Sequence, residues 1–140
     1  MDEDFEALGR RVARRLMVRG ERPRVRTAAE HLGVEIVEQA APPPAQPGLR
    51  SEYRGDPPRI ILYRDPIDLL AGAIHASQRF DMLNCNLDEV HIAHELFHHL
   101  EAADRFGKLR QEESEEAAHA FAQELLGLSF NPVELHELLR

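Results

Sequence analysis

The chain has 140 residues, 43% of them hydrophobic, with one cysteine and a formal net charge of −8 at pH 7. This length predicts a single domain, residues 1–140, that is large enough to bury a hydrophobic core. The lone Cys85 excludes an internal disulfide, and the acidic start and lack of a long apolar run argue against a signal peptide or a membrane span. We therefore expect a cytoplasmic protein with no membrane partner.

The first half of the chain alternates between helix and strand signals. Apolar spacing predicts an amphipathic helix over Phe5–Val18, and Thr27 is expected to cap a short helix that ends at His31. Residues 40–48 contain four prolines and are expected to form a stiff exposed loop. Three strands are predicted, at residues 34–38, 49–53 and 59–63.

The second half of the chain is predicted to be helical. Pro66 suits the first turn of one helix, and Asn86 followed by Glu89 predicts the capped start of another that continues to about Arg105. A third helix covers 115–126, reached through a loop at 106–108 that lets it fold back, and a short helix follows Pro132. The expected fold class is α+β, with helices packed on one side of a small three-stranded sheet.

The helix after Asn86 carries the motif H-E-x-x-H in His94-Glu95-Leu96-Phe97-His98. Helical residues four apart lie about 40° apart around the axis, so both imidazoles face one side and can hold one Zn²⁺ ion. Glu95 can then reach a water at the metal as a general base without binding the metal itself. The spacing therefore predicts a zinc hydrolase with His94 and His98 as ligands.

Catalytic zinc usually has three protein ligands, and three carboxylates are candidates for the third. Asp104 needs a helix break that Glu101 does not supply, and Glu101 itself lies about 10 Å along the helix from His94. Glu115 is favoured, because a helix that folds back would bring it to the metal, with His119 one turn later as a supporting group.

A hydrolase also needs a donor for the oxyanion of its transition state. Four side chains are candidates for this role: His119, His91, Tyr53 and Tyr63. His91 is favoured instead as a solvent-facing histidine beside the site. Cys85 is interpreted as a small hydrophobic residue rather than a metal ligand.

Two segments resemble the ImmA/IrrE-type metallopeptidases, which are small bacterial zincins. Residues 93–98 are similar to the family's A-H-E-[LI]-G-H, with Phe97 in place of glycine, and residues 115–126 are similar to E-x-E-A-N-x-F-A-x-x-L-L, with His119 in place of asparagine. The likeness extends over residues 5–128. It implies a zincin-like fold, zinc at His94, His98 and Glu115, and cleavage of a partner protein, which in several members is a transcriptional repressor.

Two other functions match parts of the sequence. One is a weakly active or inactive zincin-fold module that binds a partner protein, although a structural metal site would not need Glu95. The other is DNA binding, because the first helix is rich in arginine and residues 27–34 resemble half of a helix-turn-helix. The segment that follows leaves no recognition helix, so we do not expect a nucleic acid partner. Nothing in the sequence specifies an oligomeric state.

Overall fold

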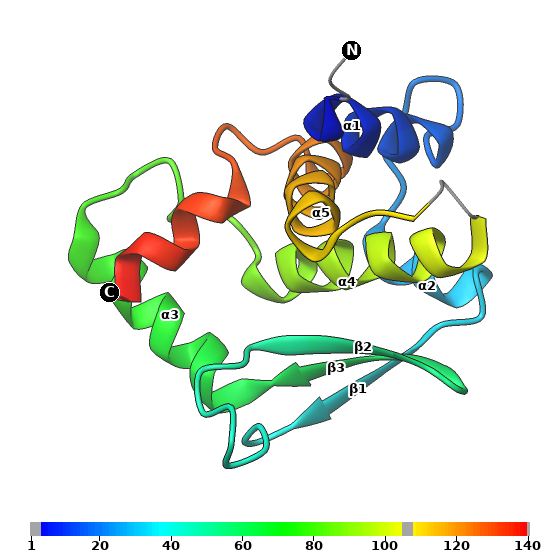
Figure 1. Cartoon of the computed structure of the whole chain (residues 1–140). Coiled ribbons are helices and arrows are strands. Elements are labelled where there is room, and N and C mark those ends of the chain that lie inside the picture. Colours follow the sequence, from blue (N-terminus) through cyan, green and yellow to red (C-terminus); the bar gives the residue numbers. More distant parts are fainter. Residues whose placement is uncertain (1–3, 105–107, 140) are drawn as a thin grey trace.

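The computed structural model describes residues 4–104 and 108–139 and shows an α+β fold, in which helices lie along one side of a small sheet (Figure 1). The predicted loop at Phe106 and Gly107, and the side chain of Asp104, lie outside the described residues. Within the described ranges, no helix is both long enough and apolar enough to cross a membrane.

The sheet is mixed, with β3 (Pro58–Tyr63) at its centre. β1 (Glu35–Gln39) pairs with β3 in parallel and β2 (Ser51–Gly55) pairs with it antiparallel, so that β2 is an edge strand. Side chains alternate between the two faces of a strand. Ile60 and Leu62 of β3 therefore point together into the main hydrophobic core under the helices.

Three helices build most of that core. α4 (Leu87–Asp104) contacts β2 and β3, α5 (Gln111–Leu126) packs on α4, and α1 (Phe5–Arg15) covers α5. The contact between α1 and α5 is close, because a Cβ at Gly9 would lie 2.1 Å from the carbonyl oxygen of Ala117. Only glycine fits there, and this packing holds α5 against α4.

The remaining helices flank this unit. α2 (Val25–His31) leads into β1, and α3 (Arg64–Ser77) packs against the C-terminal 3₁₀ helix η1 (Pro132–Leu139). α3 and η1 share a second, smaller core. The buried members of that core are Leu70, Ile74, Met82, Val90, Phe130 and Leu135.

The predicted order of elements agrees with the structure, but several boundaries were wrong. The first helix stops at Arg15, because Arg19 and Gly20 take positive φ angles in a tight turn that pairs Val18 with Glu21. The second begins at Val25 and has Arg24 as its cap, so that Thr27 lies inside it.

The strand boundaries also shift by one or two residues, and the last predicted helix is a 3₁₀ helix. The start of α4 is as expected, with the Asn86 side chain accepting a hydrogen bond from the Glu89 backbone amide at 3.1 Å.

Candidate metal centre

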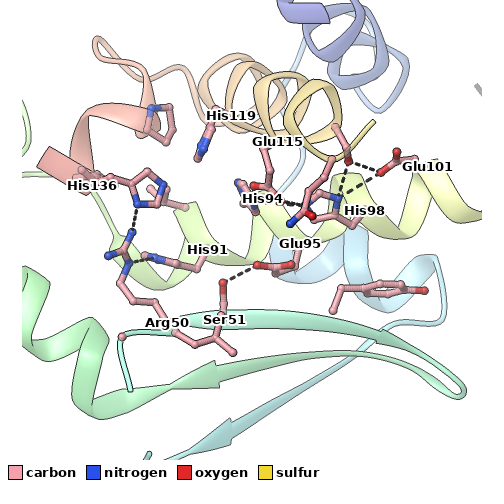
Figure 2. Close-up of a pocket in the computed structure, with 18 of the residues that line it drawn as sticks. Arg50, Ser51, His91, His94, Glu95, His98, Glu101, Glu115, His119 and His136 are labelled. Atoms are coloured by element: carbon pink, nitrogen blue, oxygen red, sulfur yellow. Dashed lines mark hydrogen bonds and ion pairs between the residues drawn. The ribbon is translucent and has the colours of Figure 1, made fainter. Parts of the chain in front are cut away.

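Three side chains from two helices meet at one point of the molecule (Figure 2). His94 and His98 come from α4, and Glu115 comes from the first turns of α5. One Glu115 oxygen lies 2.8 Å from Nε2 of His94 and the other lies 3.1 Å from Nε2 of His98, while the two Nε2 atoms are 3.4 Å apart. This group can hold a metal ion.

The spacing of these atoms fits a small tetrahedral cation. Zinc binds imidazole nitrogen and carboxylate oxygen at about 2.0–2.2 Å, so two ligand atoms on one tetrahedral zinc lie roughly 3.3 Å apart. The separations of 2.8, 3.1 and 3.4 Å, in which Glu115 offers a different oxygen to each imidazole, lie close to this value. Two imidazoles and one carboxylate are also donors that zinc commonly takes.

The electrostatics of the group favour a cation. Burial by itself would raise the pKa of Glu115, but hydrogen bonds from His94 and His98 hold it well below its usual range. Burial would likewise lower the pKa of His98, yet its hydrogen bond to Glu115 and the charges of Glu95 and Glu115 raise it to about 9. Negative charge thus accumulates around the imidazoles, and a metal ion binding there would displace the proton from His98.

Glu101 orients His98 from the side away from Glu115. Its Oε1 lies 3.3 Å from Nδ1 of His98 and accepts a hydrogen bond of 2.6 Å from the hydroxyl of Ser114. A carboxylate on the far nitrogen of a ligating histidine fixes the ring and its tautomer. Glu101 is correctly excluded as a ligand by its distance along the helix, but its supporting role was not predicted, although a position three residues after His98 is a signal for such a contact.

Glu95 lies beside the group without joining it. Its side chain points toward β2, where Oε2 accepts a hydrogen bond of 2.7 Å from the hydroxyl of Ser51, and the residue is only 6% exposed (Figure 2). Among the described residues, Glu95 Oε1 has no hydrogen-bond partner. Glu95 is therefore held in place while one oxygen stays free to exchange a proton.

These residues line an open cleft of ≈ 640 Å³. Its walls come from α4, α5, η1 and the chain that enters β2. Tyr53 of β2 lines it, and its hydroxyl lies 2.7 Å from Nδ1 of His99. Tyr63, the other tyrosine among the four candidates, does not line the cleft: alternation along β3 turns it to the far face of the sheet, where its hydroxyl donates to Glu52.

The other two predicted histidines both line the cleft and are buried. The ring centroid of His119 lies 4.6 Å from that of His94, and burial lowers the pKa of His119 to about 3. Its Nδ1 is buried without a hydrogen-bond partner in the described structure. His91 is not solvent-facing as favoured from the sequence. It is 7% exposed, and both of its nitrogens are hydrogen bonded.

Comparisons with known proteins add nothing to this geometry. No family model, curated protein or solved structure matches the chain. The chemistry of the site is therefore inferred from its own residues.

Cys85 lies away from this cleft, beside the smaller core under α3. It is partly buried, and burial raises the pKa of its thiol. This environment fits the interpretation of Cys85 as a small hydrophobic residue.

The buried His91 predicts a pH dependence of stability. Burial lowers its pKa to about 4, against about 6.5 in an unfolded chain, so the unfolded state binds the proton first as pH falls. Stability from neutral His91 is therefore present above pH 6.5 and is lost as pH falls toward 4. Between pH 7 and pH 5 we expect the free energy of unfolding to fall by about 2 kcal/mol more in the wild type than in a His91→Gln variant.

Urea unfolding at the two pH values measures this difference. A His75→Gln variant is the matched control, because His75 is an exposed histidine on α3 and should leave the pH dependence of the wild type unchanged. Parallel pH curves for the wild type and His91→Gln would show that His91 is not held neutral by burial.

Proposed function

We propose that this chain is a zinc-dependent peptidase with a zincin-like fold, in which α4 is the active-site helix. The observation that carries the proposal is the position of Glu95. Glu95 lies between His94 and His98 in the sequence, and both of these face Glu115. The side chain of Glu95 is nevertheless hydrogen bonded to Ser51 and is not part of that group. A site that only bound metal for structural reasons would have no need of a separate carboxylate fixed at this point.

In this proposal His94, His98 and Glu115 would hold the zinc. A zinc ion bound there would supply a Lewis acid that activates water near neutral pH and polarises the substrate carbonyl. Glu95 takes the proton of the attacking water on Oε1 and later delivers it to the leaving amine. Ser51 keeps the carboxylate in the orientation that both transfers need, and Glu101 keeps the ring of His98 fixed.

The edge of β2 gives the cleft a wall suited to an extended peptide. β2 has β3 on one side only, and its residues Ser51 and Tyr53 line the cleft. A substrate backbone can add to such an edge as a further strand. The resemblance to the ImmA/IrrE-type enzymes suggests a protein substrate, with a transcriptional repressor as the first class to test. The single cysteine suits a cytoplasmic enzyme.

A peptide library tests this function without knowledge of the natural substrate. The full chain, loaded with one equivalent of zinc, is incubated with a mixture of random peptides, and the products are identified by mass spectrometry. We expect new peptide ends that are absent after treatment with a zinc chelator and return when zinc is restored. Zinc binding without any new peptide end, with natural repressor candidates also uncut, would favour the non-catalytic binding module.

A further inference from the structure

Arg50 lines the end of the cleft that lies away from Glu101 (Figure 2). Arg50 stands directly before β2, and its guanidinium lies between α4 and η1 (Figure 2). Its Nε donates to Nε2 of His91 at 3.1 Å, and its Nη2 donates to Nδ1 of His136 at 2.9 Å. Two imidazoles thus hold the guanidinium in one orientation.

Both partners of Arg50 act as neutral acceptors. Nδ1 of His91 lies 2.7 Å from the carbonyl oxygen of Leu87 and must donate to it, so Nε2 is the acceptor for Arg50. His136 accepts the second hydrogen bond through Nδ1. Neither contact compensates the positive charge of Arg50.

Arg50 differs in this respect from paired arginines elsewhere in the chain. Arg79, for example, contacts the carboxylates of Asp81 and Glu134 at 2.9 Å each. Within the described residues, Arg50 forms no ion pair, although it is half-buried in the cleft wall. A buried charge without a counter-ion is costly, so this position favours an anion that comes from outside the chain.

The charges of the cleft are separated along its length. The carboxylates among its described lining residues lie in or beside the metal group: Glu115 belongs to it, and Glu95 and Glu101 lie next to it. The opposite end holds Arg50 with His91 and His136. His91 precedes His94 by three residues, which is about one helical turn or 5 Å. The histidine that holds Arg50 is therefore a near neighbour of a metal ligand on α4, so the Arg50 end of the cleft adjoins the place where a peptide bond would be held.

The guanidinium also retains donors for a ligand. Arginine has five N–H groups, and hydrogen bonds to the two histidines use two of them. Among the described residues Nη1 has no hydrogen-bond partner, and it is not one of the buried atoms that lack one, so its N–H groups are accessible on a residue that lines the cleft. A parallel pair of such groups binds a carboxylate through two hydrogen bonds.

We propose that Arg50 is a specificity-determining residue that binds a carboxylate of the substrate close to the scissile bond. This inference rests on the proposed peptidase function. Either an acidic side chain or the carboxylate at the end of a peptide supplies the same group. The alternative is that Arg50 only stabilises the fold by linking the start of β2 to α4 and η1, which needs no ligand.

The test uses metal-binding probes in matched pairs. Succinic and glutaric monohydroxamates carry a zinc-binding group and a carboxylate, and their amide counterparts have the same shape without the charge. Binding to the zinc-loaded full chain is measured by calorimetry. We expect the acid of at least one pair to bind roughly ten- to a hundredfold tighter than its amide, as for a hydrogen-bonded charge.

Variants assign this preference to Arg50. Arg50→Gln should bind acid and amide equally, whereas Arg50→Lys should keep part of the preference because it keeps the charge. Arg54→Gln is the matched control: Arg54 is an exposed arginine on β2, four residues after Arg50 and outside the cleft, and its loss should leave the preference intact.

The outcomes separate this inference from the function on which it rests. Equal affinity for acid and amide in the wild type would overturn the role of Arg50, and this comparison does not depend on how a variant folds. Failure of all probes to bind, acids and amides alike, would instead remove the metal centre and both proposals with it.

Longer probes identify the source of the carboxylate. One pair of peptide hydroxamates has a free or an amidated C-terminus, and a second pair has both ends blocked with an internal glutamate or glutamine. Tighter binding of the free C-terminus in the first pair supports a terminal carboxylate. Tighter binding of the glutamate in the second pair supports an acidic side chain. If neither pair shows a preference for the charged member, the proposal is contradicted.

Discussion

Glu95→Gln will abolish most peptide cleavage while zinc affinity stays that of the wild type. Loss of a general acid–base group typically lowers a rate about 10²- to 10⁴-fold. Glutamine has the same shape, and its amide oxygen can still accept the hydrogen bond of Ser51 that Glu95 Oε2 now accepts at 2.7 Å. The fold and the metal group should therefore persist, and only proton transfer is lost. Cleavage rate and zinc affinity are measured on the same preparation.

Glu89→Gln is the control for this substitution. Glu89 is a partly exposed residue on the same helix that does not line the cleft, so its replacement should leave the cleavage rate within about twofold of the wild type. A Glu95→Gln protein that cleaves at the wild-type rate would remove Glu95 from the mechanism. A Glu95→Gln protein that loses zinc would instead make Glu95 part of the metal group.

Glu115→Gln will weaken zinc binding by more than about a hundredfold, because mutation of groups that merely support a ligand already costs 10- to 100-fold. The substitution removes the negative charge that faces both imidazoles at 2.8 and 3.1 Å. Calorimetric titration of the full chain with zinc measures the change. Cleavage at limiting zinc should fall in parallel.

Glu116→Gln is a closely matched control, since it makes the same chemical change one residue along α5. Glu116 is exposed and does not line the cleft, so zinc affinity should stay unchanged. Equal zinc affinities for Glu115→Gln and Glu116→Gln would show that the third ligand lies elsewhere.

The metal group could be predicted from local patterns because helices repeat their geometry. His94 and His98 share a face wherever they stand on a helix, and the Asn86 cap with an uninterrupted run predicted that helix. Glu115 was harder, because it depends on the packing of α5 on α4. The position of Glu115 one turn before His119 favoured it over the other candidate ligands. The close contact of Gly9 with α5 could not be predicted from the spacing of residues in the sequence.

The rest of the cleft could not be predicted, because it is built from isolated residues far apart in the chain. Ser51 and Arg50 contact α4 because the sheet places β2 beside that helix, and His136 belongs to the C-terminal 3₁₀ helix. Tyr53 and Tyr63 looked equivalent in the sequence. The alternation of side chains along each strand distinguishes them, because it turns Tyr53 toward α4 and Tyr63 to the far face of the sheet.

Anomalous diffraction from crystals grown with zinc tests the central claim most directly. The account predicts one strong zinc peak within about 2.0–2.2 Å of Nε2 of His94, Nε2 of His98 and a carboxylate oxygen of Glu115, with Glu95 nearby but not bound. A zinc peak without Glu115 among its ligands, or zinc bound only at another place on the molecule, would contradict it.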